Sequence, residues 1–470
     1  MKLSKLNISL VVVVLTMPLF IYAIVNVLPT YDDWSTLSSP NFNPEWQQFF
    51  FRWGVVWRPL DALMGYIVAL DYRLFPTLNH ICIFTGHALN TFMVYRICRK
   101  FNFQELTANI ATIFFYLSPA MLGTVLSVDG LNQTYAHLFG LLSLWVLLTV
   151  KGTPRYPLFM LMVMAAALAK ENGLAWAVAA PVVARAFKSS SLWQFLKDVA
   201  TGILTAALYA AIRLSIPYHE IINNEYFSAT ILYRLSRTLM LVAYTWIPID
   251  YVSLFHEPSR SYLMLAATTL LALPMLWLLF VRRLPRWFSI RVLMLLGAYI
   301  VVMSPHLVTA ISTMHTYAGL SVASLALASV IDLYPNPHRL KRAFFLFLLA
   351  FLITDAHHTV KAIETSRTGK KMALQVISQA RKPINKSFTI NIEGNQRKFS
   401  LFCVTPIDAF SNGEAVEYET GYRWPLHREG INISEQDVHK VDSITNNALK
   451  AGFEGVFVVR GDSVVVREQL

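Results

Sequence analysis

The stretch that decides the fold is residues 10–34, LVVVVLTMPLFIYAIVNVLPTYDDW, in which an apolar run is followed by two adjacent acids. The run is long enough to cross a bilayer once, and Pro29 ends its helix. Because two lysines precede it among the first five residues, the positive-inside rule predicts a cytoplasmic N-terminus and places Asp32 and Asp33 on the outer side. No small-residue cleavage site precedes Pro29, so we interpret this span as an uncleaved anchor.

The composition predicts a polytopic membrane protein. Of 470 residues, 55% are hydrophobic and only 14% are charged, and the apolar residues form blocks separated by short basic clusters. The net charge of +12 comes largely from these clusters, which lie at the ends of apolar spans where topology signals belong. The positive charge therefore indicates orientation in the membrane and gives no reason to expect a nucleic-acid partner.

The pattern of charge and hydropathy predicts two regions. Residues 1–355 are expected to be all-α, with about 11 transmembrane helices, the N-terminus inside and the C-terminus outside. Within them, residues 28–75 form the first outer loop, with the acidic pair and interfacial helices, and residues 217–260 form a second large outer loop. Residues 356–470 end in two alternating stretches joined by a Gly-Asp turn at 461–462, which predicts a small extracytoplasmic α+β soluble domain.

The acidic pair is the first candidate for catalysis. Adjacent carboxylates at a membrane surface raise the pKa of one of them, which suits a general base. We expect Asp33 to be the base and Asp32 to orient a cation or cap the following helix, although a capping pair in a solvated loop explains the tetrapeptide equally well. No zinc-ligand spacing or Gly-rich phosphate loop occurs, so the sequence identifies no certain cofactor, and a divalent metal, if one binds, would use Asp32 and Asp33.

Several cations share the outer side with these acids. Arg58 and Lys170, with Arg52, are the candidates for neutralising a donor phosphate, and Glu171 is expected to orient Lys170. Two alternatives stay open. The arginines can simply extend to lipid headgroups, and Lys170 can form a structural ion pair with Glu171 at a helix break.

Five short motifs follow one another along the chain. They are Asp32-Asp33, Trp57-Arg58-Pro59-Leu60, Leu74-Phe75-Pro76-Thr77-Leu78-Asn79-His80, His87-Ala88-Leu89-Asn90 and Ala169-Lys170-Glu171-Asn172-Gly173-Leu174. Their order resembles the GT-C superfamily of integral membrane glycosyltransferases, in particular the protein O-mannosyltransferase branch and its tetratricopeptide-bearing relatives. The resemblance covers roughly residues 1–350, and the tetratricopeptide repeats are absent.

One further motif departs from that branch. His315-Thr316-Tyr317 stands where the branch has Glu-Arg-Tyr, so this chain shares only the tyrosine. The resemblance makes His315 and Tyr317 accessory site residues, and a phosphate role at this position depends on His315 as a substitute for the arginine.

The resemblance implies a transferase. It would move a sugar from a polyprenyl-phosphate donor to a glycan, lipid or protein acceptor on the outer face, by an inverting single displacement with the acidic loop as base. The short cytoplasmic loops agree with this, because they leave no room for a nucleotide-sugar domain. We expect the protein to lie in a bacterial inner membrane, among lipids that supply the donor.

Two other functional classes are compatible with a polytopic chain. A transporter or flippase of lipid-linked saccharides would need polar groups along a path near mid-bilayer, whereas the acids and bases here lie mostly at span ends. A non-catalytic membrane scaffold would not need carboxylates opposite Arg58 and Lys170. The glycosyltransferase is therefore the preferred interpretation.

Single-cysteine labelling tests the predicted orientation. In a cysteine-free background, an impermeant thiol reagent added from the outer side should modify Asp33→Cys and Tyr226→Cys and should spare Arg99→Cys and Arg283→Cys, because the arginines belong to inner basic clusters. Reagent that crosses the membrane should modify all four. Labelling of either arginine position from outside would contradict the predicted span order.

Overall fold

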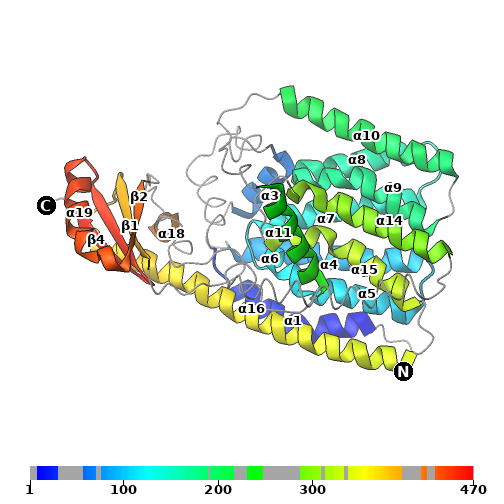
Figure 1. The fold of residues 1–470 in the computed structure, drawn as a ribbon, viewed down its shortest axis with the longest axis horizontal. Helices are drawn as coiled ribbons and strands as arrows, with labels where there is room; N and C mark the ends of the chain where they lie inside the picture. The colour runs from blue at the N-terminus through cyan, green and yellow to red at the C-terminus, as the bar shows by residue number, and fades with distance from the viewer. Residues whose placement is uncertain are drawn as a thin grey trace.

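The structure is a computed structural model. It describes residues 8–29, 57–69, 76–188, 191–215, 230–246, 286–307, 313–332, 337–393, 414–420 and 429–468. In these residues a bundle of helices is joined by one long helix to a small four-stranded sheet (Figure 1). The chain is mostly helical and its strands lie in the C-terminal region, which is the predicted order of the two structural classes.

The bundle is built of helices, as the apolar blocks of the sequence predict. Their bounds are α1 (Ile8–Asn26), α3 (Pro59–Ala69), α4 (Thr77–Lys100), α5 (Glu105–Leu117), η3 (Pro119–Met121), α6 (Leu122–Val125), α7 (Gly130–Thr149), α8 (Arg155–Ala169), η4 (Glu171–Ala175), α9 (Trp176–Phe187), α10 (Leu192–Ser215), α11 (Ile231–Trp246), α14 (Arg286–Met303), η6 (Ser304–Leu307), η7 (Thr313–His315) and α15 (Thr316–Asp332). The predicted interfacial segment that opens at Arg58 contains α3.

The number of membrane spans differs from the prediction. Within the described residues, α1 and α10 are long and apolar enough to cross a membrane alone, and a third span results if α5 is counted with the segment bent from it by 44°. The predicted number of about 11 crossings is therefore not confirmed. One reason is visible in α7, whose first turns carry Asn132, Gln133 and His137, all buried. Polar side chains that face the inside of a bundle lower the hydropathy of a helix without meeting lipid.

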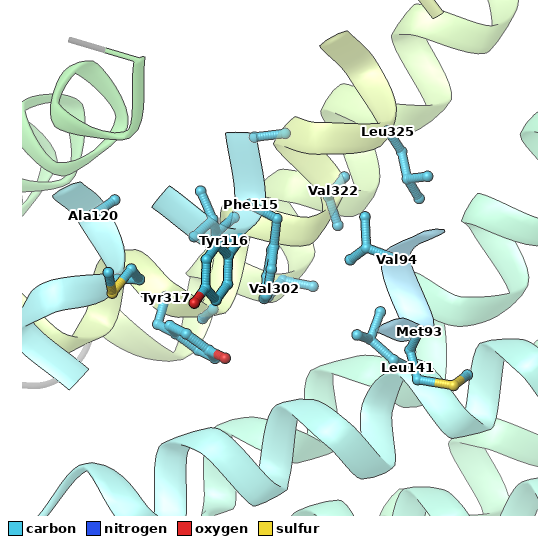
Figure 2. Close-up of a cluster of buried hydrophobic side chains, with 14 of the residues drawn as sticks. Met93, Val94, Phe115, Tyr116, Ala120, Leu141, Val302, Tyr317, Val322 and Leu325 are labelled. Carbon is cyan, nitrogen blue, oxygen red and sulfur yellow. The ribbon is translucent and has the colours of Figure 1, made fainter. Parts of the chain in front are cut away.

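The core of the bundle brings α4, α5 and α15 together. Figure 2 shows Phe115 and Tyr116 of α5 close to Tyr317 of α15, and the ring centroids of Phe115 and Tyr317 are 5.7 Å apart. The Tyr317 hydroxyl accepts from Asn90 Nδ2 and pairs with His87 Nδ1, each at 3.0 Å. These bonds satisfy polar groups that would be costly to bury alone, and they hold α4 to α15.

The C-terminal domain lies at the far end of α16 (Pro337–Gln379), away from the bundle (Figure 1). Its other elements are β1 (Ser387–Glu393), α18 (Glu414–Thr420), β2 (Gly430–Ser434), η9 (Glu435–Lys440), α19 (Val441–Lys450), β3 (Gly455–Arg460) and β4 (Ser463–Glu468). The strand order is β2-β1-β3-β4, with β1 parallel to both neighbours and β3 antiparallel to β4. The predicted final hairpin is confirmed, and Gly461 adopts the φ of +60° that its tight turn requires.

Two glutamines attach α16 to the edge of the sheet. Gln375 Oε1 accepts the Val464 N–H at 2.9 Å, and Gln379 Oε1 accepts the Val466 N–H at 3.0 Å. Gln379 Nε2 also donates to the Val464 carbonyl at 2.9 Å. The two glutamines are four residues apart and so share one face of α16. They pair with backbone groups of β4 that a sheet edge would otherwise leave open.

Candidate functional site at the break between α8 and α9

The candidate site forms where the helical path between α8 and α9 is interrupted. Lys170 ends α8 in an extended conformation, with φ −156° and ψ 138°. Gly173 permits the sharp turn, because a Cβ there would lie 2.4 Å from the Ala166 carbonyl oxygen. The Gly173 N–H donates to the Lys170 carbonyl at 2.8 Å. The turn places Lys170 inside the protein, where it is only 6% exposed.

Neutral groups hold the Lys170 ammonium. Its Nζ donates to Asn132 Oδ1 at 2.9 Å and lies 3.3 Å from Met314 Sδ. Among the residues that the structure describes, no carboxylate forms an ion pair with it. Burial lowers the pKa of Lys170 to about 8, while Asp129 opposes this shift and Arg58 adds to it.

Asn132 connects the ammonium to two carboxylates. Its Nδ2 donates to Asp129 Oδ1 at 3.0 Å and approaches Asp61 Oδ2 at 3.4 Å. Asp61 lies in the first turn of α3 and Asp129 directly precedes α7, positions at which the helix dipole favours negative charge. Gly130 fixes the turn that carries Asp129, because a Cβ on Gly130 would lie 1.7 Å from the Thr124 carbonyl oxygen.

Arg58 is the second cation of the site. Its Nε donates to Glu171 Oε2 at 2.7 Å, across 113 positions of sequence. Burial opposes the charge of Arg58, but Glu171, Asp129 and Asp61 outweigh burial and raise the Arg58 pKa above its ordinary value. Arg58 therefore stays charged. Since Glu171 takes Nε, the terminal nitrogens of the guanidinium can receive a further anion.

Two stacked histidines accompany these cations. The ring centroids of His306 in η6 and His315 in η7 are 3.9 Å apart, and the ring planes differ by 21°. Burial lowers the pKa of His315 well below its ordinary value, and His306, Lys170 and Arg58 lower it further. His315 is therefore neutral near pH 7, so it can act as a hydrogen-bond donor or acceptor without adding charge.

The structure brings three of the predicted site residues into one buried cluster: Arg58, Lys170 and Glu171. Glu171 pairs with Arg58, whereas the alternative of a local ion pair at the helix break would join it to Lys170. His315 borders the cluster through its charge interactions with both cations. Tyr317 lies instead in the core of the bundle, where its hydroxyl has two partners.

Three predicted residues, Asp32, Asp33 and Arg52, lie outside the described residues, and their roles remain predictions. Within the described ranges, no group of three or more His, Cys, Asp or Glu side chains is arranged to hold a metal ion. The two acids expected to bind any divalent metal are themselves outside those ranges.

Asp61 and Asn132 belong to the cluster but were not among the residues predicted for the site. Asp61 follows Arg58 by three positions at the start of a helix, and this spacing on one face is a usable signal. The sequence gives no such signal for Asn132. Asn132-Gln133-Thr134 has the pattern of a glycosylation sequon and lies at the start of an apolar span. In the structure Asn132 is wholly buried in α7.

The arrangement of helices and C-terminal domain is shared with ArnT from Cupriavidus metallidurans. The alignment with the crystal structure of ArnT in the apo state covers 97% of this chain and 97% of the ArnT chain, with a TM-score of 0.52 and 12% sequence identity. This chain has the fold of ArnT. The crystal structure of ArnT bound to undecaprenyl phosphate gives a TM-score of 0.49 and 14% identity over the same shares of both chains. No family model matches the chain, and no curated protein matches its sequence.

At this level of identity the likeness to ArnT shows the fold alone. That fold agrees with the predicted helical bundle and small C-terminal sheet, and among the described residues α1 and α10 are long and apolar enough to cross a membrane. The predicted O-mannosyltransferase branch is not confirmed.

A double-mutant cycle tests the pairing of Glu171. Arg58→Gln and Glu171→Gln should be coupled by about 1 kcal/mol in the free energy of unfolding, because each removes the same partly buried ion pair. The partial exposure of Glu171, 38%, keeps the value small. A matched cycle of Lys170→Gln with Glu171→Gln should give coupling close to zero. Thermal melting in detergent measures both cycles, and stronger coupling of Glu171 to Lys170 would contradict the observed pairing.

Proposed function

We propose that this protein is a membrane glycosyltransferase that moves a sugar from a polyprenyl-phosphate donor to an acceptor on the outer face. The observation that carries the proposal is the convergence of Arg58 and Lys170 beside Asp61 and Asp129 in a chain with the GT-C fold. The acceptor, whether a glycan, a lipid or a protein, belongs to the proposal only as a class. A bacterial inner membrane is the proposed location.

The two cations suit the phosphate that leaves when the sugar is transferred. A phosphate gains negative charge at its bridging oxygen as the bond to the sugar breaks, and preorganised cations in a poorly hydrated site stabilise that charge. Arg58 offers the paired donors of its guanidinium, and Lys170 offers a compact charge that no carboxylate of the described residues contacts directly. Together they would hold one phosphate from two elements of the fold.

The carboxylates of the cluster serve a different purpose from the proposed base. Asp61 and Asp129 share the Asn132 amide and raise the pKa of Arg58, so they balance the buried positive charge. The base that takes the acceptor's proton is therefore assigned to the acidic pair, Asp32 and Asp33, with Asp33 preferred. The transfer is proposed to be a single displacement with inversion.

The interior of the bundle favours this proposal over a transporter. His87, Asn90 and Tyr317 are buried polar residues at its centre, and they bond to one another among packed aromatic rings. A transport path would need polar groups that face an open passage. Arg58, Lys170 and Asp129 gather instead near the break between α8 and α9.

Lys170 should make donor binding depend on pH. The ammonium attracts phosphate only while protonated, and its pKa is about 8, so affinity for a polyprenyl-phosphate sugar should be full near pH 7 and fall as pH rises through 8. A bound phosphate raises that pKa, so the transfer rate at saturating donor should fall only at higher pH. Lys170→Met should weaken affinity at pH 7 by about tenfold or more and remove this pH dependence. Binding isotherms in lipid nanodiscs, recorded at several pH values, measure the affinity for the donor. Normal affinity in well-folded Lys170→Met protein would show that Lys170 does not bind the donor phosphate.

The two acids of the first outer loop should differ in importance. Adjacent side chains point in different directions, so one should face the acceptor while the other orients a cation or caps a helix. Asp33→Asn should lower the transfer rate by about a hundredfold or more, and Asp32→Asn by much less. Transfer of labelled sugar by purified protein, normalised to folded yield, measures both. Near-normal rates in both variants would remove the base from this loop.

A further inference from the structure

The amide of Asn132 lies between opposite charges that would otherwise attract one another directly. Its oxygen accepts from Lys170 Nζ at 2.9 Å, while its nitrogen donates to Asp129 Oδ1 at 3.0 Å and approaches Asp61 Oδ2 at 3.4 Å. Asn132 is wholly buried, and Lys170 and Asp61 are 6% and 1% exposed. Both ends of one amide are therefore occupied by charged groups, of which Lys170 and Asp61 are buried and Asp129 is half-buried.

Buried opposite charges normally pair directly. The attraction between them grows as the dielectric falls and the distance shortens, so an ammonium beside two carboxylates gains most by contact. Such a contact would cancel the positive field that an anionic ligand needs. A neutral amide can solvate both charges while keeping them apart, because its oxygen accepts from the cation and its hydrogens go to the anions.

We propose that Asn132 is a positioning residue: its amide keeps Lys170 apart from Asp61 and Asp129 and so leaves the ammonium available to the donor phosphate. The consequence for the donor rests on the proposed function, whereas the separation of charges does not.

The surroundings of Lys170 give this amide its effect. Within the described residues, the charged and titratable groups that face it are Arg58 ahead of α3, Asp61 in α3, Asp129 ahead of α7, Glu171 in η4, His306 in η6 and His315 in η7. Glu171 is held by Arg58, and His315 is neutral near pH 7. Asp61 and Asp129 are therefore the acids that could close on Lys170 if the amide were lost.

An exchange of two side chains tests the proposal. The double variant Asp129→Asn with Asn132→Asp keeps net charge and volume but puts a carboxylate against Lys170. The affinity for polyprenyl phosphate at pH 7 should be at least tenfold lower than in the native protein. The pH at which affinity decreases, near 8 in the native protein, should be higher by about one pH unit or more. Asn90→Asp is the matched control, because Asn90 is equally buried but bonds to Thr134 and Tyr317. The Asn90→Asp variant should lose affinity at the same pH as the native protein.

The pH dependence of stability provides a readout that needs no donor. Lys170 has a folded pKa of about 8 and an ordinary value of 10.5, so between these values the unfolded chain holds a proton that the folded chain lacks. The thermal midpoint of the native protein relative to its Lys170→Met variant should therefore rise with pH across that window. In the exchanged protein, compared with the same protein carrying Lys170→Met, the rise should begin at higher pH.

Each outcome decides a separate question. If the native protein binds no polyprenyl phosphate at any pH, the proposed function fails, and the stability trend still decides the role of Asn132. If the exchanged protein keeps native affinity and an unshifted stability trend, Asn132 does not separate the charges. If the exchanged protein does not fold, Asn132→Ala replaces it, because loss of the amide lets Lys170 close on Asp129. An unshifted stability trend in Asn132→Ala protein would overturn the proposal equally.

Discussion

The burial of the Lys170 ammonium is the constraint on which the rest of the site depends. A charge removed from water costs several kcal/mol unless nearby groups replace its hydration. Here Asn132 and Met314 supply the contacts, and Asp61 and Asp129 supply the opposing charge at a distance. These groups come from α3, α7 and η7, so the ammonium is tolerated only where those elements meet the break after α8.

The same constraint explains why the site lies at interruptions of the helices. A regular helix has its backbone groups satisfied internally, and its side chains follow one fixed rotation, so it cannot turn a long cation sharply inward. The chain breaks at Lys170, and Gly173 admits the close approach to Ala166 that the break requires. At Asp129 a second tight turn depends in the same way on Gly130. Gly173 and Gly130 thus permit the two turns, and these turns place Lys170 and Asp129 in the site.

The sequence predicted helix positions better than it predicted contacts. Apolar runs ended by basic clusters gave the places of most helices in the bundle, and the polar interruption at Lys170 marked a real break. The partner of Glu171 could not be predicted, because neighbours in sequence suggest Lys170 while the fold brings Arg58 from 113 positions away. The predicted number of crossings is not confirmed for a related reason, since inward-facing polar residues in α7 lower the hydropathy of that helix.

Asn132 was the hardest member of the cluster to foresee. Its value comes from two charges on other elements, and nothing in its own neighbourhood distinguishes it from a sequon asparagine. Arg58 and Lys170 were easier, because buried or interfacial cations in an otherwise apolar chain are rare and usually functional. A pair of interacting residues can therefore be predicted from the sequence only when one of the two is a residue type that is rare in its surroundings, such as a cation in an apolar chain.

Among the described residues, the C-terminal domain also contacts the bundle next to this site, at Val128. Val128 is buried in one apolar cluster with residues of α16, such as Met372 and Val376, and with Phe457 of β3. Its carbonyl accepts from Asn79 Nδ2 at 2.9 Å. Val128 directly precedes Asp129, so one short turn is fixed on one side by apolar burial with the domain and on the other by the Asn132 amide.

This shared turn gives a physical reason why one continuous helix, α16, connects the bundle to the domain. Gln375 and Gln379 pair with the backbone of β4, and the face of α16 that carries them also contributes to the cluster around Val128. A flexible linker would let that cluster open and would release the turn that carries Asp129. A continuous helix from the bundle to the sheet helps to hold the Asp129 carboxylate against the Asn132 amide, which separates that carboxylate from Lys170.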